Sequence, residues 1–457
     1  MAQAQAASGE NAYRITAELT GQVKEAVQAQ DQDCLVALLD ALHVADIADL
    51  FEQVDPELRR DAVALWGRHF DSEVISELDE SIQEELLSQL PRERLKEVVR
   101  DLESDDVVDL VEDLDAEQQR EVLSALNDVD RAVVEQSLQY PEESAGRLMQ
   151  REIVMVPSHW DVGTAIDHMR SETGLPEQFY HLFLTDPKVK FVGMASLGRI
   201  MSSRRETRLL DIIEEDCRPI PATMPEEEVA YAFNQYHLIS APVVGEDGRL
   251  VGVITIDDAM NVLDEEAEED ILRLAGVGSE SLYDRVFDTA TQRFPWLIVN
   301  LATAIAASAV IDQFSEAIGM MVALAVLMPI VASMGGNAGT QSLTVAVRAL
   351  ATKDLTGSNA WRIIRRESMV GLINGLVFAA IVGVVGGIWF SSTSLGAVLA
   401  LAMIITMFAA ALSGILIPIG LERVRIDPAL ASGVFVTTVT DVIGFFAFLG
   451  IAAAILF

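Results

Sequence analysis

The sequence has few of the residues that disulfide bonding, catalysis or nucleic-acid binding require. Only two of its 457 residues are cysteine and six are histidine, and 32 lysines and arginines stand against 70 aspartates and glutamates. Cys34 and Cys217 lie far apart and match no CxxC spacing. We therefore interpret them as free thiols in a reducing compartment. Because so acidic a chain repels nucleic acid and attracts metal cations, no nucleic-acid partner is expected.

Signatures of enzymes and of secretion are missing as well. We find no nucleophile with a neighbouring base, no phosphate-binding glycine loop and no site for a metal-bound water, so the sequence does not predict an enzyme. The first residues, MAQAQAASGENAYR, lack the basic start and apolar stretch of a secretory signal. The N-terminal part is therefore expected to stay in the cytosol.

Charge is distributed unevenly along the chain. From Phe294 onward there are seven acids and seven bases, so residues 1–293 hold the whole net charge of −38. A hydrophobic fraction of 51% rarely occurs together with such a charge in one uniform globule. The sequence therefore predicts a multi-domain membrane protein, in which an acidic soluble part is joined to an apolar one.

Residues 30–147 are predicted to form an all-α domain of helical repeats, the N domain. Short segments such as LVALLDAL and RERLKEVVRDL carry Leu, Val and Ile at intervals of three and four residues. Segments this short cannot bury an apolar stripe alone, so we expect them to stack as a small superhelix with a solvated acidic face. Residues 1–29 are expected to be disordered.

An internal repeat follows, with a first copy at 148–208 and a second at 209–263. FVGMASLGRIM at 191–201 aligns without gaps on LVGVITIDDAM at 250–260. Each copy is predicted to run as a strand entry, a helix, two strands and a final helix. This order resembles a tandem pair of CBS motifs, an α/β regulatory module that often binds adenine nucleotides.

The second copy keeps a short nucleotide-binding pattern. In CBS copies that bind nucleotides, a Ser or Thr followed three residues later by Asp commonly holds the ribose. Thr255 and Asp258 match this pattern, whereas the first copy has Ser196 and Arg199. The resemblance implies an ATP site at the second copy only, and the alternative is that Thr255 merely caps a helix.

A strongly acidic helix, DEEAEEDILRLAGV at 264–277, is predicted within a connecting segment at 264–293 that leads to the apolar part. Acids at successive helical positions repel one another unless cations neutralise them. We therefore predict a metal sensor here. The predicted sensor residues are Glu265, Glu266, Glu268, Glu269 and Asp270, together with Asp257 just upstream.

The remaining part, 294–457, is predicted to be a five-span transmembrane domain. Its apolar stretches lie at approximately 294–311, 318–343, 369–390, 395–421 and 430–457. Each reaches the roughly 18 to 25 residues that cross a bilayer. Basic residues gather in the loops after the second and fourth stretches, so these loops and the N-terminal domains are expected in the cytosol, with the C-terminus outside in the periplasm.

Asp441 is the one ionisable residue within these stretches. A carboxylate near mid-membrane costs several kcal/mol unless it lines a wet cavity or meets a cation, so Asp441 is predicted to mark an ion path. Thr437, Thr438 and Thr440 stand within about one helical turn of it and offer further oxygens.

The segment SMGGNAGTQSL is predicted to interrupt the second stretch. It sets the oxygens of Asn337, Thr340 and Gln341 beside Gly335 and Gly336. Glycines that only permit close helix approach are the alternative reading. Neutral oxygens and a carboxylate, without His or Cys, suit Mg²⁺ or Ca²⁺ better than zinc or copper. One Asp per chain suggests that a second chain supplies the opposite wall.

Three motifs together resemble the MgtE magnesium transport family over nearly the whole chain. They are YPEESAGRLM at 140–149, PIVASMGGNAGTQSLTVAVRAL at 329–350 and IDPALASGVFVTTVTDVIG at 426–444. The resemblance implies a homodimer in membrane lipid with a pore along the dimer axis. It also implies that Asp441 selects Mg²⁺ and that Asn337 lines the pore.

The same resemblance implies a gate. It makes 264–277 a plug helix controlled by Mg²⁺ held among cytosolic acids, and it places Asp427 near the inner mouth of the pore as a further sensor residue. The family usually has Pro where this chain has Val434, which predicts a weaker helix break there. The expected function is Mg²⁺ uptake across the bacterial inner membrane. Two alternatives stay open, namely coupled transport of another divalent cation such as Mn²⁺ or Co²⁺, and a nucleotide-sensing CBS membrane regulator without conduction.

Overall fold

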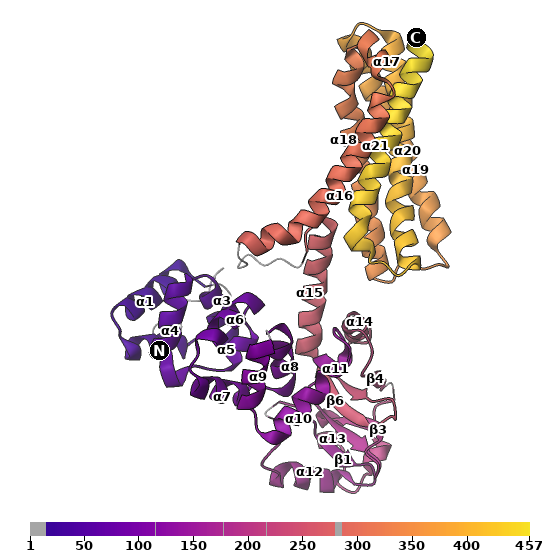
Figure 1. Ribbon diagram of the computed structural model, residues 1–457. Coiled ribbons are helices and arrows are strands. Elements are labelled where there is room, and N and C mark those ends of the chain that lie inside the picture. The colour runs from indigo at the N-terminus through magenta and orange to yellow at the C-terminus, as the bar shows by residue number, and fades with distance from the viewer. Residues whose placement is uncertain (1–14, 115, 177, 216, 279–285) are drawn as a thin grey trace. The chain divides into compact units, whose positions relative to one another are not determined.

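The computed structural model of the 457-residue chain describes residues 15–114, 116–176, 178–215, 217–278 and 286–457 (Figure 1). The chain divides into two compact units, Met1–Asp264 and Glu265–Phe457. The first unit holds a helical N domain followed by two small sheets with their helices, and the second holds the end of one long helix and a bundle of apolar helices.

The N domain consists of short amphipathic helices that stack against one another (Figure 1). They are α1 (Ala17–Gln28), α2 (Gln32–Leu39), α3 (Val44–Glu52), α4 (Pro56–Trp66), α5 (Glu73–Ser76), α6 (Glu80–Gln89), α7 (Arg92–Asp101), α8 (Ser104–Asp113), α9 (Ala116–Ala125) and α10 (Asp128–Ser137). Their apolar residues form two clusters, one around Phe51 and Trp66 and one around Val99 and Val111. Polar caps begin several helices, as where the Asp31 carboxylate accepts the Cys34 N–H at 3.1 Å.

Helix α1 corrects the expectation that residues 1–29 are disordered. Its apolar face buries Val23, Ala26 and Val27 against α2 and α4. Burial of three apolar side chains offsets the entropy that the chain loses in forming this helix. Residues 1–14 lie outside the described residues.

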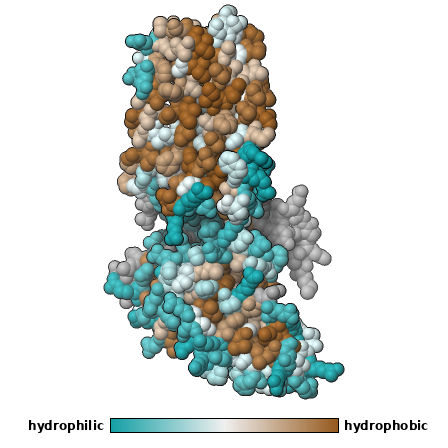
Figure 2. All heavy atoms as spheres, turned by 90° about the vertical axis from the view of Figure 1, so that its right-hand side faces the viewer, coloured by the Kyte–Doolittle hydropathy of each residue, from teal (hydrophilic) through white to brown (hydrophobic). Residues whose placement is uncertain are grey.

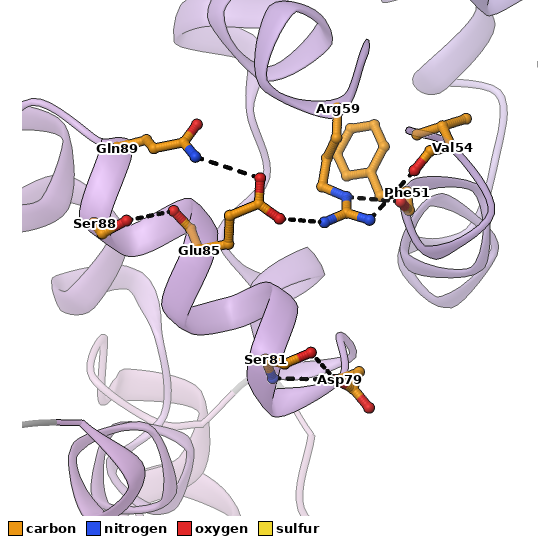
Figure 3. A network of polar contacts seen from close by, with 8 residues as sticks. All are labelled: Phe51, Val54, Arg59, Asp79, Ser81, Glu85, Ser88 and Gln89. Atoms are coloured by element: carbon orange, nitrogen blue, oxygen red, sulfur yellow. Dashed lines mark hydrogen bonds and ion pairs between the residues drawn. The ribbon is translucent and has the colours of Figure 1, made fainter. Parts of the chain in front are cut away.

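A buried arginine joins α3, α4 and α6 (Figure 3). The Arg59 side chain donates to the carbonyl oxygens of Phe51 at 2.8 Å and Val54 at 3.3 Å, and it pairs with Glu85 at 2.7 Å. Arg59 is only 3% exposed. Its charge is thus matched by a carboxylate and two carbonyl dipoles inside the domain, as a buried guanidinium requires.

The repeat in the sequence is also a repeat in the structure. The first copy contains β1 (Met155–Pro157), α12 (Val162–Ser171), β2 (His181–Thr185), β3 (Phe191–Ser196) and α13 (Leu197–Ser202), preceded by α11 (Ala145–Leu148). The second contains β4 (Ile220–Pro221), α14 (Glu226–Tyr236), β5 (Ser240–Val244), β6 (Leu250–Thr255) and the start of α15 (Ile256–Leu274). In both sheets the middle strand runs parallel to the first and antiparallel to the third, with an irregularity at the same place in the register. The predicted tandem α/β pair is therefore confirmed.

The second unit contains five helices long and apolar enough to cross a membrane. They lie within α16 (Val286–Asp312), α18 (Ala323–Ala351), α19 (Ala360–Trp389), α20 (Thr393–Arg423) and α21 (Pro428–Leu456), with the short α17 (Ser315–Met320) between the first two. Hydrophobic side chains cover most of the surface of this bundle on the face in Figure 2. The C-terminus lies near α17 in Figure 1. The rings of Phe314, at the start of α17, and Phe446 of α21 meet at 5.9 Å.

Two details of the predicted spans were wrong. The second span is not interrupted, because α18 runs unbroken from Ala323 to Ala351 through its glycines. The third begins earlier than residue 369, since α19 starts at Ala360. This earlier start brings Glu367 into the helix as a buried acid in addition to Asp441.

Candidate functional site

One face of α18 carries polar side chains that stay exposed on the single chain. We call this set the α18 polar face; its members are Ser333, Asn337, Thr340, Gln341 and Thr344. Their spacing of three and four residues puts them along one side of the helix. Amide side chains facing lipid tails would cost several kcal/mol each. This face therefore requires water or another protein surface beside it.

Asp441 lies at the same level of the bundle as Asn337. Thr440, the residue before Asp441, packs between two glycines of α18. A Cβ built on Gly335 would lie 3.6 Å from the Thr440 Cβ, and one on Gly339 would lie 3.2 Å from the Thr440 Cγ2. Asn337 stands midway between these glycines. The Asp441 side chain is half-buried, and within the described part of the chain no hydrogen bond or ion pair holds it.

The glycines of α18 serve mainly to bring helices together. A Cβ on Gly335 would lie 2.6 Å from the Thr406 Cγ2 of α20, and one on Gly339 would lie 2.7 Å from the Val436 Cγ1 of α21. Gly335, predicted as a pore residue, therefore faces its own bundle, as the alternative reading held. Gly336 has open space around it, and its carbonyl accepts the Thr340 hydroxyl at 3.0 Å.

Helix α21 is unbroken at Val434. The Thr437 hydroxyl donates to the Gly433 carbonyl at 2.9 Å, and the Thr438 hydroxyl donates to the Val434 carbonyl at 2.7 Å. Helix α21 runs from Pro428 to Leu456, so no break exposes backbone oxygens at Val434 in this structure. The oxygens that α21 offers to an ion beside it are those of the Asp441 carboxylate and the exposed Thr437 hydroxyl.

The end of α15 is fastened to the start of α21. Arg273 contacts the Asp427 carboxylate at 2.9 Å and also pairs with Glu269 one turn earlier on its own helix. Asp427 in turn caps α21 by accepting the Ala429 N–H at 2.7 Å. Leu274 packs into an apolar cluster of α18 and α21 side chains. Two predicted sensor acids, Glu269 and Asp427, are thus paired with an arginine in this structure.

The other predicted sensor acids of α15 lie along one helix and do not converge. Asp257, Glu265 and Glu268 are exposed, whereas Glu266 and Asp270 are partly buried. Among the described residues, no three His, Cys, Asp or Glu side chains come together in a way that would hold a metal ion. A cation bound here would have to draw acids together from their present positions.

A second group of acids lies where the N domain meets the CBS pair, and the sequence analysis singled out only one of them, Asp258, as a nucleotide contact. We call Glu103, Asp105, Asp106, Glu152 and Asp258 the junction acids. Contacts across this junction are well defined, since the Ser104 hydroxyl donates to Glu152 at 2.7 Å and the Gln150 amide donates to Glu103 at 3.1 Å. Asp105 is 8% exposed.

Burial and the charges of neighbouring acids raise the pKa values of Glu103, Asp105, Asp106 and Asp258. Burial, and next the charge of Asp258, raise the pKa of Asp105 well above its usual range. The same two causes raise the pKa of Asp106 to about 7. Burial raises the pKa of Asp258 to about 6, although the Thr255 hydroxyl opposes the rise, and burial and the charge of Glu152 raise the pKa of Glu103. Carboxylates that repel each other in this way favour the uptake of protons or cations.

Sequence reasoning overlooked the other junction acids because their pattern is ordinary. The letters ESDD at the start of α8 fit acids in the first turn of a helix, where the helix dipole stabilises them. Their partners Glu152 and Asp258 stand far away in the sequence. The one available signal was that Asp105 and Asp106 directly precede the buried pair Val107 and Val108.

The predicted nucleotide pair is in contact. The Thr255 hydroxyl donates to the Asp258 carboxylate at 2.6 Å, and the Thr255 N–H donates to it at 3.3 Å. Thr255 directly precedes α15, so this contact also fits a helix-capping role. In the first copy, Arg199 donates to the Ile213 carbonyl at 2.8 Å, and Ser196 has no acid in the position of Asp258.

Comparison with protein families matches three parts of the chain. The MgtE family model, described as a divalent cation transporter, matches residues 328–451. The model of the MgtE intracellular N domain matches 42–143. The CBS domain model matches 145–206 and 210–265.

Curated proteins and solved structures give the same result. The magnesium transporter MgtE of Thermus thermophilus is 32% identical over 446 residues, which are 96% of this chain and 99% of that protein. The magnesium transporter MgtE of Bacillus subtilis is 32% identical over 333 residues, which are 73% and 74% of the two chains. A structure described as the cytosolic domain of the Mg²⁺ channel MgtE in complex with ATP is 30% identical, with a TM-score of 0.50, and covers 53% of this chain and 99% of that one.

Proposed function

Because the chain belongs to the MgtE family of divalent cation transporters, we propose that it is a Mg²⁺-selective channel or transporter for magnesium uptake across the bacterial inner membrane. The observation that carries this proposal is the α18 polar face, with Asn337 at the level of the Asp441 carboxylate. A polar face and the Asp441 carboxylate, inside an apolar bundle, are stable only beside water or ions.

The chemistry of this face suits magnesium. Asn337, Thr340, Gln341 and Thr437 offer neutral oxygens, and Asp441 adds one negative charge. Mg²⁺ gives up its water reluctantly and is commonly held by one or two carboxylates while it keeps several waters. Amide and hydroxyl oxygens then bind those waters. Hydrated Mg²⁺ thus matches a wide polar face better than a cage of protein ligands.

A homodimer completes the path. One chain supplies one polar face and one Asp441, so a second copy across a twofold axis would close the pore and double the charge. The CBS pair supports this as well, because Met201 and Met260, which occupy equivalent positions of the two copies, are 66% and 56% exposed. Two exposed methionines at matching positions fit a face that a second chain covers.

The gate is proposed to respond to Mg²⁺ in the cytosol. Basic residues gather between the apolar cores of α18 and α19 and between those of α20 and α21, which favours a cytosolic position for these connections and for the N-terminal domains. Mg²⁺ bound among the junction acids would offset their repulsion and favour the compact form of the first unit. The end of α15, fastened by Arg273 at Asp427, would then act as the plug.

Adenine nucleotide is proposed as a second ligand of the CBS pair. The contact between Thr255 and Asp258 preserves the ribose-binding pair, and a similar cytosolic domain was solved with ATP. Since Asp258 is also one of the junction acids, nucleotide and Mg²⁺ would meet at one side chain. Calorimetric titration of the full chain with ATP, beside D258A, tests this, and equal heats from both proteins would contradict it.

Uptake into liposomes tests the proposed transport. The purified chain is reconstituted, and entry of Mg²⁺ is followed with an internal dye under an imposed membrane potential. We expect uptake that follows the potential and does not depend on a proton or Na⁺ gradient. Uptake that requires either gradient would favour the coupled transporter, and absence of any divalent flux would favour the non-conducting regulator.

A further inference from the structure

A buried acid in α19 accepts a hydrogen bond from the side of α18 that lies away from the polar face. The Ser342 hydroxyl donates to the Glu367 carboxylate at 3.3 Å, and both residues are buried, with exposures of 6% and 8%. Among the described residues of α18 to α21, no other side-chain hydrogen bond or ion pair joins two of these helices. The function proposed above leaves this contact unexplained.

Small residues bring Glu367 within reach of α18. Helix α19 packs on α20 through glycines, and a Cβ on Gly371 would lie 2.5 Å from the Ala411 Cβ. Glu367 is one turn earlier on the same side of α19. Opposite it, Gly414 lets α20 approach α18, since its Cβ would lie 2.6 Å from the Gly339 carbonyl oxygen and 2.8 Å from the Ser342 Cβ. With no side chain at 414, Glu367 reaches Ser342.

Ser342 lies on the other side of α18 from the polar face. It follows Asn337 by five residues, which is about 140° around the helix axis at 3.6 residues per turn. The hydrogen bond at Ser342 therefore holds α18 on its bundle-facing side, while Asn337 faces away from the bundle. Along the helix axis, Ser342 lies little more than one turn from Asn337.

We propose that Glu367 and Ser342 are positioning residues for ion conduction, which fix the rotation and depth of α18 so that the Asn337 amide stays level with Asp441. Helices in lipid have little hydrophobic drive to associate, so steric fit and specific polar contacts set their relative positions. The fit of Thr440 between Gly335 and Gly339 positions α18 against α21, and Gly414 brings it close to α20, but these contacts are purely steric. The hydrogen bond supplies the specific point of attachment.

The test, which rests on the proposed function, compares ion selectivity between variants. S342A removes the donor, E367L removes the acceptor at similar size, and E367Q keeps an acceptor oxygen. Ser413 offers a matched control, because it is also buried but its hydroxyl donates to the Ala410 carbonyl of its own helix at 3.0 Å. The readout is the ratio of Mg²⁺ to Ca²⁺ uptake into liposomes, which does not depend on how much protein is active.

We expect S342A and E367L to lower this ratio about fivefold, in the range that one interhelical hydrogen bond controls. The double variant should lose no more than either single one, because both remove the same bond. E367Q and S413A should keep the ratio of the wild-type protein. A Mg²⁺ to Ca²⁺ uptake ratio in S342A equal to that in S413A would overturn the proposal. So would a loss of Mg²⁺ and Ca²⁺ uptake in the same proportion. If the wild-type protein itself passes no Mg²⁺, the proposed function fails instead.

Discussion

At the scale of single residues, buried charge dominates the behaviour of the first unit. Arg59 is held by Glu85 and two backbone carbonyls in the core of the N domain. If the guanidinium is removed, the Phe51 and Val54 carbonyls lose this donor, and among the described residues the Glu85 carboxylate keeps only the Gln89 amide at 3.3 Å. Breaking a buried pair from one side is costly, because the remaining polar groups stay desolvated.

We predict that R59A destabilises α3, α4 and α6 by about 3 kcal/mol. Hydrogen exchange of the full chain, followed for the amides of these helices, measures the change. Arg60 is the matched control, since its contact with Asp61 lies at the surface at 3.3 Å. R60A should change the same amides by less than about 0.5 kcal/mol. Equal effects of both variants would contradict the role given to Arg59.

The junction acids predict that pH changes stability in a definite direction. The pKa of Asp106 is about 7 in the folded chain, and about 3.9 is usual for an unfolded Asp. Between about pH 4 and pH 7 folding therefore takes up a proton, so the cost of Asp106 is absent below about pH 4, grows as the pH rises toward about 7 and levels off above that. Lowering the pH from 8 to 6 should stabilise the first unit by about 1 kcal/mol through Asp106 alone.

Thermal unfolding of the metal-free full chain at pH 8 and pH 6 checks this, with D106N as the comparison. The variant should show a smaller difference between the two pH values. Saturating Mg²⁺ should also reduce the difference, because a bound cation replaces the protons. A melting temperature that rises with pH over this interval would contradict the raised pKa of Asp106 among the junction acids.

At the scale of elements, the proposed gate depends on the attachment of α15 to α21. Arg273 supplies a positive charge to Asp427 from within the chain, at a place where the sequence predicted a metal ligand. The ion pair and Leu274 hold the same end of the helix.

We predict that R273Q weakens closure and raises the Mg²⁺ concentration needed to halve uptake by about threefold, as expected for loss of a partly exposed ion pair. Flux at several Mg²⁺ concentrations on the cytosolic side gives this value. R425Q, an exposed basic residue two positions before Asp427, is the control for general charge effects. If R273Q leaves the Mg²⁺ concentration that halves uptake unchanged, the ion pair between Arg273 and Asp427 has no part in closure.

Much of the element structure could be predicted from the sequence, because local pattern determines it. The periodicity of three and four residues predicted the helices of the N domain, and the internal repeat predicted the paired sheets. The length of the apolar stretches predicted the spans. The errors have physical reasons. Glycines were read as a break in α18, yet they fit a continuous helix by packing on Thr406 and Val436. Helix α19 starts before its apolar stretch, which hid Glu367.

The candidate site was only partly predictable. Asp441 and Asn337 stood out because polar residues are rare in apolar segments. That they lie at one level depends on how Thr440 fits between two glycines of a different helix, and no local pattern carries this information. The junction acids other than Asp258 were missed for the same reason, since Asp105 and Asp258 come together only through the packing of the N domain on the CBS pair.

At the scale of the whole molecule, residues 1–293 hold the whole net charge of −38, and the neutral apolar bundle that follows carries one polar face. The acids of the first unit are proposed to respond to the ion that the bundle is proposed to pass. Both roles depend on a divalent cation. The central claim is that Asp441 and the α18 polar face form the path of that cation.

Mg²⁺ uptake by D441N in liposomes, measured beside the wild-type protein and D312N, tests this claim most directly. D441N keeps the size of the side chain and removes its charge, while Asp312 lies at the exposed end of α16 outside the bundle interior. We predict that D441N lowers Mg²⁺ uptake at least about tenfold, because loss of one charged ligand from a site in low dielectric costs more than 1.4 kcal/mol, and that D312N behaves as the wild-type protein. Uptake by D441N equal to that of D312N would contradict the account.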